Sequence, residues 1–271
     1  MKRAILLIAI LLLPTVLAES FPNQNPNYGF VGWQIESGEK IGEYRLTYPS
    51  ISEGEEVNMA QNGPFAVVVF YADESEDTDQ YIWLQDELAL WGYITLVVEG
   101  EISWDSVEYQ LIGWNNGSYS SVPGAQNMFA LDHISLGGHG TGAHFAAEIV
   151  KSGEYEIDGL FGLGLDGSSS DHSQSVVLSR PSSALFLTGT TDDIAPANEN
   201  VMSYLNTWPG AWQVMHARGA NHIGYQETDG FFERLADGDS TMGRDGQQRH
   251  ALDHILPYLN LSLKGDDSAY Q

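Results

Sequence analysis

The chain has 271 residues, which is enough for one large domain with its own hydrophobic core. It contains 37 acidic and 11 basic residues, a formal net charge of −26, and such a chain repels nucleic acid and anionic membranes, so we expect neither as a partner. It contains no cysteine, which excludes disulfide bonds and thiolate sites.

Residues 1–18 are predicted to be a signal peptide. Lys2 and Arg3 supply its positive charge, residues 4–13 form a continuous apolar run, and residues 16–18 end in the small residue of a cleavage site. An uncleaved anchor is the alternative, but the apolar run is short for a membrane-spanning helix. We therefore expect a secreted, extracellular protein. Removal of Lys2 and Arg3 with the signal peptide changes the net charge from −26 to −28.

Residues 19–43 are predicted to form an N-terminal extension with an edge strand, 44–265 a single domain, and 266–271 a tail. Strands and helices alternate along the domain, which is typical of an α/β fold with a mostly parallel sheet flanked by helices. Strands are predicted at 29–36 and 44–49, as an antiparallel edge pair, and at 65–70, 94–98, 133–136, 159–165, 184–188 and 212–217. Helices are predicted at 79–91, 104–114, 143–150, 197–205 and 244–263.

The most informative stretch lies between the strand at 133–136 and the helix at 143–150. It is a glycine-dense turn with the sequence Gly138-His139-Gly140-Thr141-Gly142. A strand, a tight glycine turn and a helix form the context of the nucleophile elbow of serine hydrolases, G-x-S-x-G. Gly140 stands where that motif has its nucleophilic serine. The sequence therefore predicts the architecture of a serine hydrolase without the nucleophile.

An acid and a histidine follow two later strands. Asp192 comes just after the strand at 184–188, and His222 comes just after the strand at 212–217. The chain order of elbow, acid and histidine is that of the α/β-hydrolase triad, and open α/β sheets place their sites at the carboxyl ends of parallel strands. We expect the two side chains to be hydrogen-bonded and directed at Gly140, with Asp192 orienting the imidazole and His222 acting as general base.

Five segments together resemble the α/β-hydrolase fold without a cap domain. Within that fold they are most similar to the secreted esterases that include dienelactone hydrolases, platelet-activating-factor acetylhydrolases and polyester cutinases. The segments lie at 63–65, 83–93, 138–142, 189–196 and 219–222, and the resemblance covers roughly Tyr44 to the end of the chain.

This resemblance implies carboxylic-ester hydrolysis with a small-molecule or ester-like ligand and with no cofactor and no metal. It gives Asp192 and His222 the roles of acid and base. It also implies an oxyanion hole formed by the amide of Thr141 and by a second donor near Tyr71 or Ala72.

The loop after the strand at 65–70 departs from the family as clearly as Gly140 does. The family has a His-Gly or Pro-Gly turn here, which offers an oxyanion-hole amide. This chain has Tyr71-Ala72-Asp73-Glu74 instead. The loop lacks the glycine and carries negative charge, so we expect the second oxyanion donor to be impaired.

Three interpretations of Gly140 stay open at this point. The chain is a degenerate serine hydrolase that keeps its pocket and acts as a binding or scaffold protein; or it is an active esterase that uses another nucleophile, such as Thr141, or a water activated by His222; or Gly140 is an engineered or erroneous replacement of serine. Under the first interpretation, Gly140→Ser is predicted to create weak esterase activity. The acyl specificity and the oligomeric state do not follow from the sequence.

Weaker patterns have ordinary explanations. The acidic stretch at 73–79 offers oxygen ligands for calcium but lacks the glycine and glutamate of the EF-hand loop, and solvated charge is the simpler interpretation. His250 and His254 have metal-binding spacing without a third ligand. His139 and His144, beside the elbow, are expected to pack rather than bind a metal. Four tryptophans either line a pocket or belong to the core: Trp104, Trp114, Trp208 and Trp212.

Overall fold

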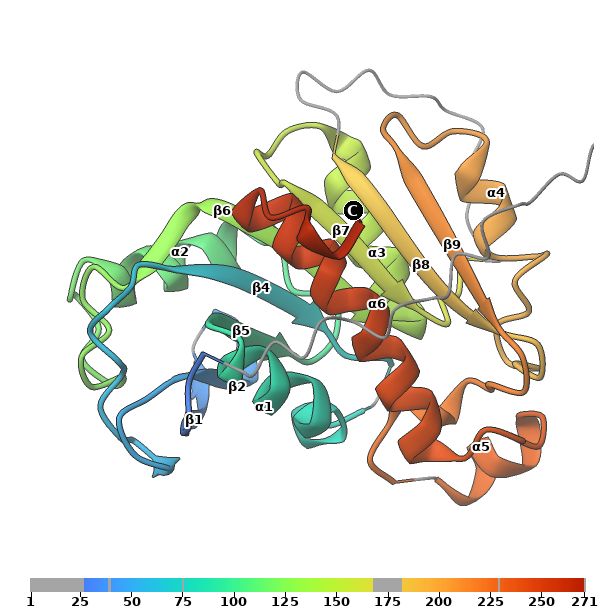
Figure 1. Ribbon diagram of the computed structural model, residues 1–271, viewed down its shortest axis with the longest axis horizontal. Helices are drawn as coiled ribbons and strands as arrows, with labels where there is room; N and C mark the ends of the chain where they lie inside the picture. The colour runs from blue at the N-terminus through green and yellow to red at the C-terminus, as the bar shows by residue number, and fades with distance from the viewer. Residues whose placement is uncertain (1–26, 39, 75, 168–181, 229, 271) are drawn as a thin grey trace, which may run out of the picture.

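A computed structural model describes residues 27–38, 40–74, 76–167, 182–228 and 230–270. Residues 1–26 lie outside the described residues, and with them the predicted signal peptide and the first part of the predicted extension. Residues 168–181, between β7 and β8, also lie outside them. At the centre of the described part is a nine-stranded sheet in the order β3-β1-β2-β5-β4-β6-β7-β8-β9 (Figure 1).

The sheet is mixed: β2 is antiparallel to both of its neighbours, and the other pairs, including β1 with the edge strand β3, are parallel. β2 pairs antiparallel with β1 and with β5, whereas all neighbours from β5 to β9 are parallel. The predicted antiparallel edge pair is therefore present, with the unpredicted two-residue β3 outside it. The strands are β1 (Val31–Gly38), β2 (Gly42–Pro49), β3 (Gly54–Glu55), β4 (Phe65–Tyr71), β5 (Tyr93–Val98), β6 (Phe129–His139), β7 (Gly159–Leu163), β8 (Ser183–Gly189) and β9 (Trp212–Ala217).

Each predicted helix is present, with shifts at three N-termini. The helix predicted from residue 143 begins earlier, at Gly140. The predicted helix at 79–91 begins as a 3₁₀ turn, and the helix predicted from residue 197 begins at Val201. The helices are α1 (Ile82–Leu90), α2 (Trp104–Asn115), α3 (Gly140–Ser152), α4 (Val201–Leu205), α5 (Phe231–Ala236) and α6 (Arg244–Lys264), with 3₁₀ turns η1 (Thr78–Tyr81), η2 (Ile223–Tyr225) and η3 (Ser268–Tyr270). The short α5 was not predicted.

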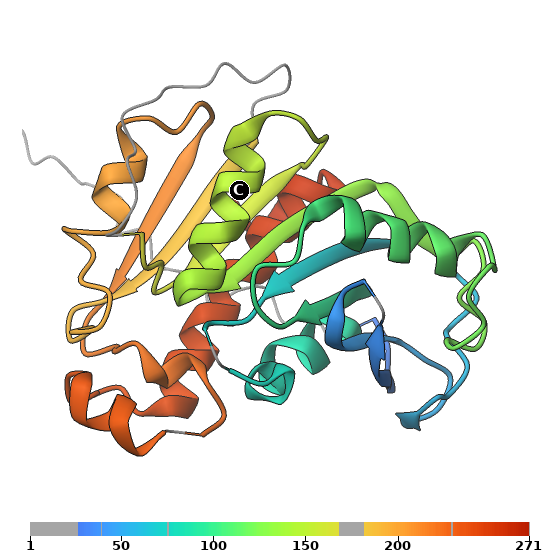
Figure 2. The ribbon, with the colours of Figure 1, turned by 180° about the vertical axis from the view of Figure 1, so that it is seen from behind.

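Helices cover both faces of the sheet. Figure 1 shows α1 and α6 in front of it, and Figure 2, from behind, shows α2 and α3 on the opposite face. β4 supplies both cores, because successive side chains of a strand point to opposite faces. Val67 and Val69 pack in the core beneath α2 and α3, and Val68 and Phe70 in the core beneath α1 and α6. This double coverage explains why β4 is apolar throughout.

The parallel strands bring their carboxyl ends to one edge of the sheet. Asp73 follows β4, Gly140 follows β6, Asp192 follows β8 and His222 follows β9. This arrangement places four segments that are distant in sequence around one site. No helix within the described ranges is both long enough and apolar enough to cross a membrane.

Candidate functional site

The elbow has the predicted strand–turn–helix geometry. Gly140 is the first residue of α3, directly after β6, and its φ of +51° lies in the left-handed region that favours glycine. The turn also requires close backbone approach, because a Cβ on Gly142 would lie 2.2 Å from the carbonyl oxygen of Ala72. The glycines therefore allow α3 to start against the end of β4.

The predicted pair of acid and histidine is present. Asp192 Oδ2 lies 3.2 Å from His222 Nδ1, and the two side chains are 0% and 2% exposed. Asp192 Oδ1 also accepts a hydrogen bond of 2.7 Å from the Ala195 amide, which fixes the carboxylate. Gly164, with a φ of +47°, packs against this pair, since a Cβ there would lie 2.9 Å from His222 Nδ1. Asp192 thus fixes the orientation of the His222 ring through its Nδ1 atom.

The carboxylate of Asp73 occupies the space that a side chain at position 140 would need. A Cβ on Gly140 would lie 2.2 Å from Asp73 Oδ1 and 2.3 Å from Oδ2, well inside van der Waals contact. Asp73 Oδ2 lies 3.0 Å from Nε2 of His222. In a catalytic triad, that nitrogen faces the serine hydroxyl. The site is therefore filled by a side chain of the protein itself.

The other oxygen of Asp73 occupies the position where an oxyanion would be expected. Asp73 Oδ1 accepts hydrogen bonds from the amide of Thr141 at 2.8 Å, the hydroxyl of Thr141 at 2.9 Å and the amide of Glu74 at 2.8 Å. The Thr141 amide, predicted as an oxyanion donor, is thus directed at a carboxylate oxygen. Both carboxylate oxygens have partners, so the Asp73 side chain is held at both ends.

The second predicted donor region, near Tyr71, lies elsewhere. Tyr71 is the last residue of β4, and its ring packs edge-on against Phe145. The amide of Ala72 donates to the carbonyl of Val98 at 3.0 Å. The second amide at Asp73 Oδ1 comes from Glu74 instead.

His139 is a member of the site that the sequence analysis placed beside the elbow but not against His222. Its ring is fully buried, and its centroid lies 4.4 Å from that of His222. His139 Nδ1 lies 3.1 Å from the hydroxyl of Tyr81, and the same hydroxyl accepts the Asp73 amide at 3.1 Å. His139 Nε2 is buried and has no hydrogen-bond partner among the described residues.

These contacts shift the pKa values of three groups. Burial alone would lower the pKa of His222, but the hydrogen bonds and charges of Asp192 and Asp73 outweigh it and raise the pKa to about 10. Burial would raise the pKa of Asp73, but hydrogen bonding to His222, the neighbouring histidines and the Thr141 amide hold it well below its usual range. Burial, followed by the charge of His222, lowers the pKa of His139 to about 4. At neutral pH a charged His222 therefore lies beside a neutral His139.

This arrangement does not offer a general base in its resting state. Both ring nitrogens of His222 lie within hydrogen-bond distance of a carboxylate oxygen, so both carry protons as donors. An imidazole that is already protonated does not take a proton from a nucleophile. The geometry instead stabilises a charged His222 between the carboxylates of Asp192 and Asp73.

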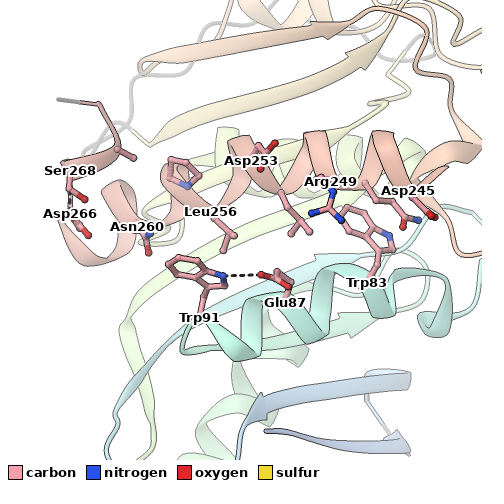
Figure 3. A pocket seen from close by; sticks show the side chains of 14 residues that line it. Trp83, Glu87, Trp91, Asp245, Arg249, Asp253, Leu256, Asn260, Asp266 and Ser268 are labelled. Carbon is pink, nitrogen blue, oxygen red and sulfur yellow. Dashed lines mark hydrogen bonds between the residues drawn. The ribbon is translucent and has the colours of Figure 1, made fainter. Parts of the chain in front are cut away.

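A groove of about 580 Å³ lies between α1 and α6, and Gly140, Asp192 and His222 do not line it (Figure 3). Trp83 and Trp91 form one wall, and their indole nitrogens are already engaged. Trp91 Nε1 donates to Glu87 Oε1 at 2.9 Å, and Trp83 Nε1 donates to the carbonyl of Tyr225 at 2.8 Å. Leu256 on α6 contributes apolar surface to the opposite wall. The two indole N–H groups are thus not available to a ligand.

The charge of this groove is predominantly negative. Four carboxylates line it against one guanidinium, that of Arg249. The carboxylates belong to Glu87, Asp245, Asp253 and Asp266. None of the four tryptophans named in the sequence analysis lines the groove. Three of them are core residues, and Trp212 on the edge strand β9 is 47% exposed.

The remaining sequence signals do not converge on a calcium or surface metal site. The acidic stretch at 73–79 is divided, because Asp73 faces the elbow while Asp79 pairs with Arg45 at 3.3 Å. His250 and His254 have ring centroids 4.6 Å apart, and no third ligand joins them in the described part of the chain. His144 packs against Tyr204, with Nδ1 in contact with the tyrosine hydroxyl.

Comparison of the chain with protein-family models and with curated protein sequences found no match. The interpretation of the site therefore depends on its geometry and on the sequence motifs that build it.

Proposed function

We propose that the protein is an α/β-hydrolase-fold protein, related to secreted esterases, that has lost ester hydrolysis and acts as a binding or scaffold protein. One observation carries the proposal: the carboxylate of Asp73 fills the place of the serine side chain and engages both His222 and the Thr141 amide. The order of elbow, acid and histidine at the carboxyl ends of parallel strands supports the choice of fold.

The same carboxylate argues against both routes of the active-esterase interpretation. A water activated by His222 would need access to Nε2, which is hydrogen-bonded to Asp73. Thr141 would need a base, but the acceptor of its hydroxyl is Asp73 Oδ1, and the lowered pKa of that carboxylate makes it a weak base.

Asp73 also favours Gly140 as the native residue. Any side chain at position 140 would collide with Asp73 in its observed place. The glycine and the aspartate are therefore matched, which an isolated replacement of serine in an ordinary esterase would not produce. Because of this collision, we expect Gly140→Ser to create esterase activity only when the Asp73 side chain is also removed.

The test is an assay of p-nitrophenyl acetate and butyrate hydrolysis by the purified protein, with His222→Ala as the matched control. We expect the two proteins to show the same background rate, because the imidazole has no nucleophile to activate. A rate that depends on His222 would overturn the proposal. Export belongs to the same proposal, and N-terminal sequencing of exported protein should return a chain that begins near Glu19.

For an organic ligand the filled site has no room, and we assign this binding role to the groove between α1 and α6. Its four carboxylates and single guanidinium favour a cation, and the faces of Trp83 and Trp91 suit an alkylammonium group through cation–π contact. The volume of about 580 Å³ matches a small organic ligand. The occupant proposed is therefore a small organic cation.

Tryptophan fluorescence provides the test of the groove. Titration with choline should change the emission of the protein, and 3,3-dimethylbutanol, which has the same shape without the charge, should bind more weakly. Equal binding of the two compounds, or binding that persists unchanged in a Trp83→Ala/Trp91→Ala variant, would overturn the assignment.

A further inference from the structure

We infer that Asp73, His139 and His222 form a binding site for one divalent transition-metal ion of the zinc class. The inference rests on the proposed function, in that an ion would be bound where ester hydrolysis has been lost. The ligand atoms that the three side chains offer all lie within 4.8 Å of one another. Within the described residues this is the cluster of histidine and carboxylate side chains that satisfies such a limit.

The chemistry of the donors selects the class of ion. Two imidazole nitrogens and one carboxylate oxygen suit zinc, cobalt or nickel, whereas calcium and magnesium prefer ligand sets made of oxygen. Three protein ligands leave a fourth position for water in a tetrahedral site. The Asp73 side chain is 16% exposed, so the site has a side through which an ion and a water can enter.

A second, independent observation is the unsatisfied nitrogen of His139. His139 Nε2 is buried and has no partner at full hydrogen-bond geometry, although the backbone of His222 lies close enough to raise the pKa of His139 through a weak contact. A buried polar atom without a partner is costly and is rare in native proteins. Because His139 Nδ1 is occupied by the Tyr81 hydroxyl, Nε2 is the nitrogen available to a ligand.

Both imidazoles have the outer partners that metal-binding histidines require. His222 Nδ1 lies 3.2 Å from the carboxylate of Asp192, and His139 Nδ1 lies 3.1 Å from the hydroxyl of Tyr81. Such a contact on the far nitrogen fixes the ring and directs the near nitrogen at the metal. The pairing of Asp192 and His222, inherited from a triad, thus becomes a carboxylate–histidine–metal arrangement.

The ion would enter between Asp73 Oδ2 and His222 Nε2, which are now 3.0 Å apart. It would replace the proton shared by these two atoms, and that proton would leave to solvent. With zinc–ligand bonds of about 2.0–2.1 Å, tetrahedral ligand atoms lie about 3.4 Å apart. The contact between Asp73 Oδ2 and His222 Nε2 must therefore widen by about 0.4 Å, and the longest separation in the cluster must shorten by at most about 1.5 Å. Asp73 lies on the loop between β4 and η1, where such a shift disturbs neither strand nor helix.

The test uses the full chain without a histidine tag, stripped with EDTA and titrated with Zn²⁺ in a calorimeter and with Co²⁺ in a visible spectrometer. We expect one ion per chain and the absorption of four-coordinate cobalt. His139→Gln and Asp73→Ala should each weaken binding by more than about 100-fold, the upper limit for loss of an outer partner. Tyr81→Phe and Asp192→Asn keep the three ligands and should weaken binding by about 10–100-fold.

The matched control is His250→Gln/His254→Gln, which removes the histidine pair on the surface of α6 and should bind the ion as the parent does. Loss of binding in this control with retention in His139→Gln would overturn the inference, as would a parent that binds no ion. Thermal melts of each variant in EDTA establish that it is folded. If Asp73→Ala does not fold, Asp73→Asn takes its place, because asparagine keeps the shape of the side chain.

The outcome is separable from that of the proposed function. Binding without ester hydrolysis supports both proposals. Binding with metal-dependent hydrolysis keeps the metal site and overturns the loss of activity, because a zinc-bound water can act as a nucleophile. Absence of binding overturns the metal site and leaves the filled elbow as it stands.

Discussion

The elbow site and the groove between α1 and α6 use charged side chains in opposite ways. At the elbow, the side chains of Asp73, Asp192 and His222 are 16%, 0% and 2% exposed, and each is hydrogen-bonded to another of the three. In the groove, four carboxylates face one guanidinium, and three of them, those of Asp245, Asp253 and Asp266, are exposed. Buried charge must be satisfied within the protein, whereas exposed charge can wait for a ligand. The charges of the three elbow side chains are thus largely compensated within the protein, whereas those of the groove are left unbalanced at the surface.

The largest effect is expected from reopening the elbow. The double variant Gly140→Ser/Asp73→Gly should hydrolyse p-nitrophenyl acetate, because the new serine would face His222 with the Thr141 amide beside it. Loss of a triad serine costs about 10⁶-fold in the subtilisin example, and an impaired oxyanion hole costs about 10²–10³-fold. We therefore expect a gain of about 10³–10⁴-fold over the parent, measured by release of p-nitrophenol.

The single variants are the controls for that gain. Gly140→Ser alone should gain less than about tenfold, because Asp73 occupies the space for the hydroxyl. Addition of His222→Ala to the double variant should remove the activity. A folded double variant with no more turnover than the parent would mean that the rest of the site has also changed.

The second effect concerns stability. Asp192→Ala should lower the free energy of unfolding by about 3 kcal/mol, the lower end for breaking a buried ion pair, because His222 keeps Asp73 as a partner. Glu87→Gln in the groove should change it by less than about 0.5 kcal/mol, because a glutamine oxygen still accepts from Trp91. Urea denaturation followed by circular dichroism measures both. Equal losses in the two variants would remove the distinction between the sites.

Most of the fold could be predicted because its signals are local. Continuous apolar runs such as residues 65–70 indicate strands that are covered on both faces, and glycine or proline ends the helices. The pairing of Asp192 with His222 could also be predicted, because parallel strands bring their carboxyl ends together. The two-residue β3 and the short α5 carry too little pattern to be recognised.

The filled elbow could not be predicted, because it depends on where one side chain turns. The sequence places Asp73 in the loop after β4 and suggests only that its charge impairs an oxyanion hole. Its contact with His222 joins residues 149 positions apart, and the space for it exists because Gly140 has no side chain. The filled elbow has one signal in the sequence, which is the combination of an acidic residue in the loop after β4 with a glycine at position 140. The groove was missed for a similar reason, since it forms where two helices far apart in sequence pack.

The pH dependence of stability in the metal-free protein should reflect the titratable groups of the elbow and not those of the groove. His222 has a folded pKa of about 10 against about 6.5 unfolded, so its contribution is complete below about pH 6.5 and is lost as the pH rises through 10. The lowered pKa of Asp73 gives a contribution that is lost in acid, below the unfolded value of about 3.9. His139, with a folded pKa of about 4, adds a loss as the pH falls from about 6.5. Stability should therefore be greatest near pH 6.5.

Melting temperatures in EDTA across this range provide the measurement, with His222→Gln as the control. The variant should lose the alkaline decline that the parent shows between about pH 7 and pH 10. Glu87→Gln should reproduce the parent's profile, since Glu87 accepts its hydrogen bond from Trp91 and not from His222. Parallel profiles for the parent and His222→Gln would contradict a charged histidine at the elbow.

The groove should respond to loss of an indole with a smaller effect. Trp91→Ala should weaken choline binding by about 3–30-fold, the equivalent of about 0.5–2 kcal/mol for a cation–π contact. The indole is only partly buried and packs beside α6, so the elbow should be unaffected. Fluorescence from the remaining tryptophans reports binding, and unchanged affinity would place the cation elsewhere.

The smallest effect is expected from salt, and it should separate the two regions. Thirty-seven acidic residues against eleven basic ones repel one another at the surface, and salt screens exposed charges beyond about 10 Å at 0.1 M. The melting temperature should rise with NaCl by about 2–4 °C, which corresponds to about 1 kcal/mol in a chain of this size. Choline binding in the groove should weaken over the same range, because the same ions screen its carboxylates. The stability lost in Asp192→Ala should stay constant, because the buried contact with His222 is screened much less. A loss in Asp192→Ala that shrinks with salt as choline binding does would mean that solvent reaches the elbow as freely as the groove, and the contrast between a closed and an open site would fail.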